Sequence, residues 1–199
     1  VQTCFAELKA DAEKKFAKPL TKVAAIGISG MMHGYLAFDK DDNLLVPFRT
    51  WRNTTTGAAA EELSALLSFN IPQRWSISHL YQAILSGEDH IGEIDHITTL
   101  AGYIHYLLTG RREVGVGEAS GIFPIDSVTG DYDAAMIAKT SAKLKEHGFE
   151  QDILPVLPAA KNAGDTGALL TEAGAKLLDP TGTLKAGIPL CPPEGDAGT

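Results

Sequence analysis

The chain has 199 residues, 44% of them hydrophobic and 21% charged, which is typical of a globular fold with a substantial core. Its formal net charge is −8 at pH 7, which argues against binding to nucleic acid or to an anionic membrane, since both partners attract a basic face. Its apolar stretches are shorter than the ~20 residues that a membrane span needs. Cys4 and Cys191 lack a CxxC spacing and no secretory signal is evident, so we expect free thiols in a cytoplasmic protein.

The first part of the chain predicts a helix, a strand and a hairpin. An amphipathic helix over residues 2–17 is predicted from four apolar residues at helical spacing, Phe5, Leu8, Ala12 and Phe16. Residues 23–28 form a continuous apolar run, typical of a strand buried on both faces. The apolar runs 35–38 and 44–46 flank a polar segment and predict a β-hairpin.

The remainder alternates predicted helices with glycine-rich loops. Helices are predicted over residues 56–69, 79–85, 101–108, 133–146 and 171–178, the first with Thr56 as its cap. Residues 115–130 hold many glycines and are interpreted as loops around a short strand at 122–125. A last strand is predicted over 187–191. Helices alternating with strands, without a repeat or a linker, predict one α/β domain.

Candidate functional residues follow the ends of two predicted strands. His33 lies between Gly30 and Gly34, where the backbone is open to a ligand, and Asp196 lies in a turn of small residues, where a carboxylate can act as a base. The segment Trp51-Arg52-Asn53 combines an indole face with hydrogen-bond donors, a combination suited to a polyhydroxylated ligand. Glu118 is expected to cap or bond backbone, and the other five histidines to lie on helix faces or at the surface.

Two other interpretations of the first strand end remain open. Residues 27–31, Gly-Ile-Ser-Gly-Met, resemble a G-x-S-x-G nucleophile elbow, which suggests a serine hydrolase, although Met31 stands where the turn needs glycine. Met31, Met32 and His33 together could also be soft metal ligands. No second cluster of this kind completes a coordination sphere, so we expect no metal bound by these residues.

Taken in chain order, several stretches resemble the amino-terminal domain of the FGGY family of carbohydrate kinases. These stretches are Ile-Gly-Ile-Ser-Gly-Met-Met-His-Gly at 26–34, the Trp51 segment, Leu-Leu-Thr-Gly at 107–110, Glu-Ala-Ser-Gly at 118–121 with Asp126, and residues 187–196. The resemblance implies an α/β fold of the actin-like, ribonuclease-H-like ATPase type, a mixed sheet flanked by helices. It also implies ATP-dependent phosphorylation of a sugar hydroxyl, most simply on a ketopentose such as xylulose.

The resemblance also implies roles for particular residues. Asp196 corresponds to the general base, and the sugar-binding segments correspond to Met32, His33, Trp51, Arg52 and Asn53. ATP and Mg²⁺ are the implied cofactors of the intact protein. The family usually has aspartate where Asn53 stands, which leaves the identity of the sugar open.

Residues 1–199 are expected to be a truncated amino-terminal, sugar-binding domain. The family's first phosphate-binding turn, Asp-x-Gly-Thr, has no counterpart in the sequence, and neither has the carboxy-terminal domain. The chain alone is therefore expected to be inactive. A non-catalytic sugar-binding module derived from such a kinase remains an alternative function. The expected partner is a small-molecule sugar, and a homodimer is left open.

Overall fold

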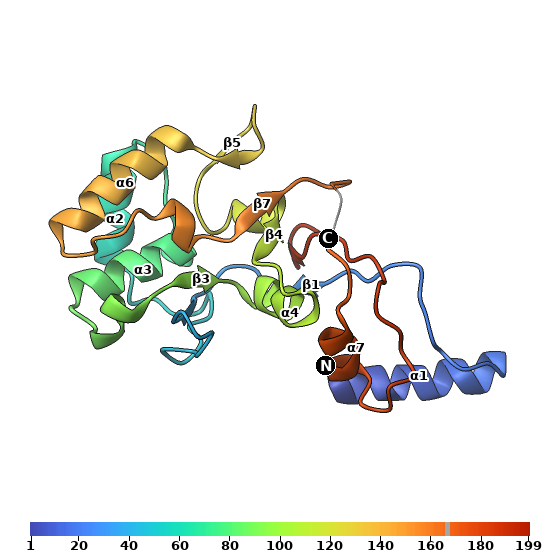
Figure 1. Ribbon diagram of the computed structural model, residues 1–199. Coiled ribbons are helices and arrows are strands. Elements are labelled where there is room, and N and C mark those ends of the chain that lie inside the picture. The colour runs from blue at the N-terminus through green and yellow to red at the C-terminus, as the bar shows by residue number, and fades with distance from the viewer. Residues whose placement is uncertain (166–167) are drawn as a thin grey trace.

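The computed structural model describes residues 1–165 and 168–199, which form an elongated molecule (Figure 1). A helical body at one end contains α2 (Gly57–Leu67), α3 (Ser76–Leu85) and α6 (Ala134–Glu146). At the other end α1 (Gln2–Phe16) packs against α7 (Glu172–Leu178). Between them lies α4 (Leu100–Thr109) with most of the short strands, so the centre of the molecule joins the two ends.

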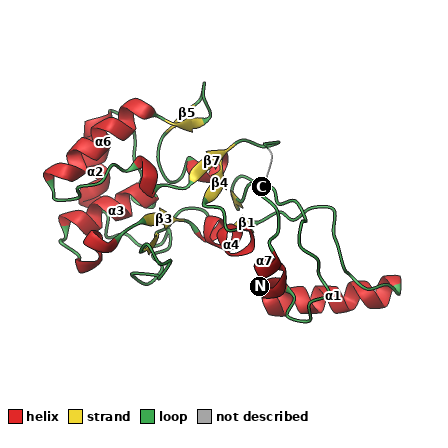
Figure 2. Ribbon diagram, viewed as in Figure 1, coloured by secondary structure: helices red, strands yellow, loops and turns green. Residues whose placement is uncertain are grey.

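The strands are short and pair two by two, as the small yellow arrows in Figure 2 show. Parallel pairs join β1 (Ser29–Gly30) to β8 (Glu194–Gly195) and β4 (Glu113–Gly115) to β7 (Ala159–Lys161). Antiparallel pairs join β2 (Leu36–Phe38) to β3 (His96–Thr98) and β5 (Ile125–Asp126) to β6 (Asp131–Tyr132). Short helical turns are α5 (Val116–Ala119), η1 (Asp89–Glu93) and η2 (Leu154–Val156). The mixture confirms the predicted α/β class.

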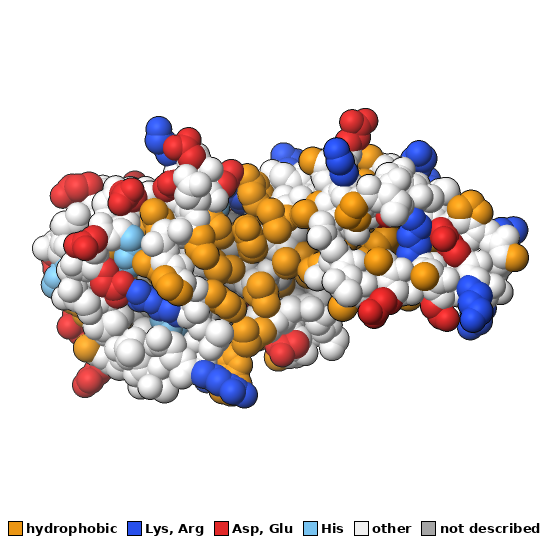
Figure 3. All heavy atoms as spheres, turned by 90° about the horizontal axis from the view of Figure 1, so that it is seen from below, with side chains coloured by type: hydrophobic (Ala, Val, Ile, Leu, Met, Phe, Trp, Pro, Cys, Tyr) orange, Lys and Arg blue, Asp and Glu red, His pale blue; other side chains and the backbone are white. Residues whose placement is uncertain are grey.

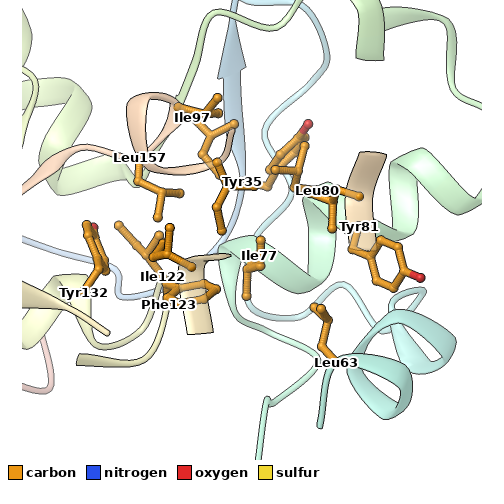
Figure 4. Packing of buried hydrophobic residues seen from close by; sticks show 14 of the residues in the cluster. Tyr35, Leu63, Ile77, Leu80, Tyr81, Ile97, Ile122, Phe123, Tyr132 and Leu157 are labelled. Carbon is orange, nitrogen blue, oxygen red and sulfur yellow. The ribbon is translucent and has the colours of Figure 1, made fainter. Parts of the chain in front are cut away.

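Two hydrophobic cores hold these elements. The larger lies under α2, α3 and α6 and is drawn in part in Figure 4, where the labelled side chains of Ile77, Ile97 and Phe123 belong to one packed cluster. The smaller surrounds α7 and contains Leu108 and Ile188. Burying one such side chain contributes roughly 1.5–3 kcal/mol. Each core therefore stabilises its own end of the molecule.

Residues at the helix ends explain why several predicted helices form in the structure. Asp133 accepts a hydrogen bond from the backbone N–H of Met136 at the start of α6, and Thr171 accepts one from Gly174 at the start of α7. Gly110, with φ of 69°, closes α4 in the left-handed conformation that glycine adopts without strain. Thr56 differs from the prediction, because its hydroxyl donates to the Gln73 carbonyl and does not cap α2.

The first helix ends at Phe16, one residue before the predicted end, and only part of its predicted apolar face is covered. Leu8 is 61% exposed and Phe16 is 66% exposed, whereas the one buried residue of the helix is Lys9. The Lys9 ammonium group donates to Asp179 at 3.0 Å and to Thr181 at 2.7 Å. The half-buried Phe5 packs against the smaller core as well, so this ion pair and one apolar contact, and not a continuous apolar stripe, hold α1 against α7.

The predicted strand over residues 23–28 is not buried on both faces. Ile26 and Ile28 are half-buried against the smaller core, while Ala24, Ala25 and Gly27 are exposed. Its backbone bonds the segment of Pro189 and Leu190 through a single parallel bridge and continues into β1. The prediction was wrong because an apolar segment is suited to burial, but its sequence does not show whether another part of the protein packs on each of its faces. The last strand, predicted at 187–191, is likewise reduced to bridges, and regular pairing occurs at β8.

Two further predictions are modified. The hairpin forms, with Phe38 bridged to Leu44 and the Asp39 carboxylate accepting from the backbone of Asp41 and Asn43, yet β2 pairs along its length with β3. Residues 115–130 contain α5, which the glycine content concealed, and the strand lies at Ile125–Asp126 instead of 122–125.

One face of the molecule, turned from the view of Figure 1, carries hydrophobic side chains across its middle and charges of both signs around them (Figure 3). In the described part of the chain, no helix is both long and apolar enough to cross a membrane. The thiols of Cys4 and Cys191 are free and exposed.

Candidate active site

The ends of β1 and β8 bring the two candidate segments together. The backbone N–H of Asp196 donates to the carbonyl of Gly30 at 2.6 Å, which continues the parallel pairing past the strand. The Asp196 carboxylate turns back and accepts a hydrogen bond from the backbone N–H of Met32 at 3.1 Å. Asp196 is exposed. The site thus presents a carboxylate to solvent whose direction is set by backbone.

A tight turn places His33 beside this carboxylate. His33 has a φ of 67° and Gly34 a φ of 94°, so two successive residues adopt left-handed conformations. Such a conformation is unusual for a residue other than glycine and is enriched at functional sites. Gly34 has no alternative, because a Cβ atom there would lie 2.7 Å from the Arg49 carbonyl oxygen. The close approach of the Arg49 carbonyl therefore requires glycine at position 34.

Both ring nitrogens of His33 form hydrogen bonds with other groups of the protein. The Arg74 Nε–H donates to Nε2 at 3.0 Å, and Nδ1 lies 3.3 Å from the carbonyl oxygen of Gly121. These partners assign the proton to Nδ1, as donor to Gly121, and leave Nε2 as an acceptor. Burial, opposed by the Gly121 hydrogen bond, lowers the pKa of His33, and the Arg74 charge lowers it further. His33 is consequently a neutral, oriented ring.

Two glutamates lie beneath the turn that holds Asp196. The Glu194 carboxylate accepts from the backbone N–H groups of Gly117 (3.3 Å) and Glu118 (2.7 Å), so it is fixed at the start of α5. The Glu118 side chain is fully buried, and neither of its oxygens forms a hydrogen bond of normal geometry within the described residues. The expectation that Glu118 caps or bonds backbone through its side chain was therefore wrong.

The environment of Glu118 favours its uncharged form. Burial is the main cause that raises the pKa of its carboxyl to about 7, and the nearby Glu194 and Asp196 carboxylates act in the same direction. The Thr99 hydroxyl, which favours the charged form, offsets this only in part. A carboxyl that keeps its proton near neutral pH next to an exposed carboxylate is typical of functional sites.

The Trp51 segment lies near the turn at His33 and Gly34 because its backbone pairs with the residue after that turn. Tyr35 and Arg49 pair as an antiparallel bridge, which places residues 49–53 alongside the turn at Gly34. The Trp51 indole is 47% exposed, with the Arg52 guanidinium 5.2 Å from its ring centroid. The Asn53 side-chain oxygen accepts from Thr55. Among the described residues, no hydrogen bond joins this segment to His33 or Asp196.

The structure thus joins Asp196 to Met32 by a direct hydrogen bond and places His33, the next residue, near enough for the Asp196 charge to act on it. Trp51, Arg52 and Asn53 lie in a neighbouring segment. Sequence reasoning missed Arg74, which lies on a different segment and bonds His33. It also missed the role of Gly121, where a Cβ atom would lie 2.5 Å from His33 Nδ1. The Glu-Ala-Ser-Gly motif at 118–121 could have predicted the contact between Gly121 and His33, since small residues permit such close approaches.

The remaining histidines are mostly inside the protein. His79 and His105 are fully buried, and His90 and His96 nearly so, each on or beside a packed element and not at the surface. Neither nitrogen of His79 has a hydrogen-bond partner in the described structure, and burial lowers its pKa to about 4. His79 lies on α3 in the helical body, whereas His96 on β3 and His105 on α4 lie in the centre of the molecule. His147, at the end of α6, is exposed, as expected.

A hollow of about 520 Å³ opens next to the site. It is lined by Gly27, Ser29, Glu194 and Thr199 together with parts of 163–165 and 189–192. The Ser29 hydroxyl is paired with that of Thr199 at 2.7 Å, and no histidine bonds it in the described chain. That geometry lacks the base which a serine nucleophile requires. Within residues 1–165 and 168–199, no group of three or more His, Cys, Asp or Glu side chains could hold a metal ion.

Solved structures show where this fold has been seen before. The chain is similar to the xylulose kinase of Rhodospirillum rubrum (TM-score 0.78, 22% identity), covering 98% of this chain and 39% of that one. It is also similar to gluconate kinase from Lactobacillus acidophilus (TM-score 0.71, 17% identity, 96% and 38% covered). A third match is Plasmodium falciparum glycerol kinase with ADP (TM-score 0.69, 17% identity, 98% and 38% covered).

These matches establish the fold and its extent. At identities of 17–22% they concern the fold alone, and the chain spans less than half the length of each of these three kinases. A comparison with curated protein sequences finds no match. The family model of the N-terminal domain of the FGGY carbohydrate kinases matches residues 1–191. The predicted actin-like α/β class is confirmed, and the chain belongs to the FGGY family of carbohydrate kinases as its N-terminal domain.

Proposed function

We propose that this chain is the sugar-side domain of an ATP-dependent kinase that phosphorylates a ketopentose such as xylulose, with Asp196 as general base. The observation that supports this role best is the hydrogen bond from the Met32 N–H to the Asp196 carboxylate. It directs one oxygen to the protein and leaves the other free to accept a proton. A base needs to be within hydrogen-bond reach of the proton that it removes, and an exposed carboxylate at a strand end satisfies that need.

The proposed step transfers one phosphoryl group. The free oxygen of Asp196 takes the proton of a sugar hydroxyl while the hydroxyl oxygen forms a bond to the γ-phosphorus of ATP. The bond between that phosphorus and the β,γ-bridging oxygen breaks, and ADP leaves with its electron pair. Phosphoryl transfer depends mostly on positioning and charge neutralisation, so one well-directed carboxylate is sufficient protein chemistry on the sugar side.

The sugar in this proposal is held by Met32, His33 and the segment Trp51-Arg52-Asn53. The half-exposed indole offers an apolar face for the C–H side of a sugar, and Arg52 and Asn53 offer donors for hydroxyl groups. Both ring nitrogens of His33 are already bonded to protein groups, so the ring offers the sugar a surface to pack against. It also orients the Arg74 side chain through their hydrogen bond. A ketopentose is favoured by the Met-His-Gly segment at 32–34.

Mg²⁺, the usual counter-ion of ATP, finds no ligand cluster in the described part of this chain. We therefore propose that the Mg²⁺ ligands, and most contacts to the ATP phosphates, come from other parts of the intact kinase. The matched kinases, more than twice as long as this chain, support that division of labour. By the same reasoning the domain alone is proposed to be inactive. A cytoplasmic location and a homodimer stay predictions.

Coupled assays on the intact protein that carries this chain test the proposal. Xylulose, ribulose, gluconate and glycerol are each offered with ATP and Mg²⁺, and ADP formation is recorded. The expected result is the highest kcat/KM with a ketopentose. Sugar binding by calorimetry without ADP formation from any substrate would instead identify a non-catalytic sugar-binding module.

A further inference from the structure

Glu118 is a buried titratable group that the proposed reaction does not use. It lies on α5, a turn that packs against β4, β7 and β8, the last of which leads to Asp196. Its side chain is fully buried, and neither of its oxygens forms a hydrogen bond of normal geometry among the described residues, although the nearby Thr99 hydroxyl favours its charged form. Native proteins rarely leave a buried polar group in this state without a reason.

The carboxyl of Glu118 lies directly against Gly195. A Cβ atom added to Gly195 would collide with Glu118 Oε2 on one side and would lie 2.7 Å from Met32 Cγ on the other. Gly195 is thus enclosed between the glutamate and the methionine whose N–H holds Asp196. The Glu118 carboxyl therefore lies against the residue that precedes the proposed base.

None of the charged groups around α5 in the described structure would neutralise a negative charge on the Glu118 carboxylate. On β8 and beyond it are Glu194 and Asp196, both acidic, and on β4 is Glu113, which faces His105 at 3.3 Å. Lys161 on β7 forms no ion pair with Glu118 in the described structure. A buried charge without a partner is costly, so ionisation would drive the carboxyl from its place.

We propose that Glu118 is a positioning residue for Asp196, whose uncharged carboxyl fills the space behind Gly195 and holds the strand end that presents the base. This inference rests on the proposed function for its effect on turnover. When Glu118 ionises, the strand end loosens and a second negative charge lies behind the base, where the phosphates of ATP approach. Turnover therefore falls as the pH rises through about 7, the pKa of Glu118.

The test compares three variants in the intact protein. Glu118→Gln keeps the shape and cannot ionise, Glu118→Ala removes the support, and Glu172→Gln is the matched control, since Glu172 is exposed on α7. The expected result is that Glu118→Gln retains kcat at pH 6 and abolishes the alkaline decline. Glu118→Ala should lower kcat by about 10²-fold with a smaller change in KM, as expected for a misplaced base. The control should follow the wild-type profile.

The outcome that overturns the inference is an alkaline decline that Glu118→Gln leaves unchanged. If Glu118→Ala does not fold, the pH profile of Glu118→Gln decides alone. Infrared difference spectra provide a readout that needs no activity: the carbonyl band of a protonated carboxyl at pH 6 should be present in the wild type and missing in Glu118→Gln. If no sugar is phosphorylated, the proposed kinase function fails, yet that band still supports the uncharged Glu118, and its absence from the wild type refutes it.

Discussion

The backbone N–H of Met32 donates a hydrogen bond to the side-chain carboxylate of Asp196 at 3.1 Å, although the two residues are 164 positions apart in the sequence. The bond joins the segments that follow β1 and β8. Because the donor is backbone, the direction of the carboxylate depends on the path of the chain and not on the side chain at position 32. A substitution at 196 that keeps an acceptor oxygen should therefore preserve the geometry of the site while changing its chemistry.

Asp196→Asn is that substitution. Its side-chain oxygen can still accept from Met32, but its amide cannot take a proton, so kcat in the intact protein should fall by ~10² to 10⁴-fold while sugar affinity changes little. Coupled assays and calorimetry measure the two quantities. Asp11→Asn, an exposed change on α1, is the control and should leave kcat unaltered. Near-normal turnover of Asp196→Asn would remove Asp196 from the mechanism.

Replacing Arg74 should change the titration of His33. The Arg74 charge lowers the pKa of His33, so Arg74→Ala should raise that pKa and allow the ring to become charged at higher pH. Titration of the His33 ring by NMR measures the shift. Arg111→Ala removes an exposed charge that His33 does not sense and should produce no shift. An unchanged or lower pKa in Arg74→Ala would contradict the contact.

Gly195→Ala should destabilise the fold. The added methyl group has no room between Glu118 and Met32, and overpacking of this kind typically costs about 1–3 kcal/mol. Urea denaturation measures the free energy of unfolding. The matched control is Gly92→Ala, because a Cβ atom at Gly92 meets nothing within 4 Å and its φ is not left-handed. Equal stability of the two variants would mean that Gly195 is not enclosed as described.

Glu118→Gln should make the fold more stable at high pH than the wild type. The pKa of Glu118 rises from 4.5 to about 7 on folding, so the folded state holds its proton more tightly than the unfolded chain. The stability from this proton is complete below pH 4.5 and is lost as the pH rises through 7. Glutamine does not titrate and avoids that loss, which at ~1.4 kcal/mol per pKa unit amounts to at most about 3 kcal/mol.

Urea denaturation at pH 4.5, 6 and 8 follows this difference. The stability gap between Glu118→Gln and the wild type should widen as the pH rises over that range, whereas Glu172→Gln should show no such trend. A gap that stays constant with pH would show that Glu118 titrates alike in the folded and unfolded chains.

Local signals in the sequence were enough to determine most helices and the family. Asp133 and Thr171 start their helices through contacts with residues three positions on, and Gly110 ends α4 within a single turn. Such contacts are made by neighbours in the chain, so a pattern of neighbours predicts them. The Met-His-Gly segment and the Gly-Asp turn likewise indicated where to look for a site, because each is a short stretch at a strand end.

Tertiary structure alone decided burial and the supporting contacts of the site. The run at 23–28 had the composition of a fully covered strand, but only the fold shows that one side is open, and only the fold buries Lys9 while exposing Leu8. Arg74 reaches His33 across 41 positions, and Glu118 meets Gly195 across a larger separation still. No local pattern encodes such pairs, because their free energies depend on which distant segments the folded chain packs together.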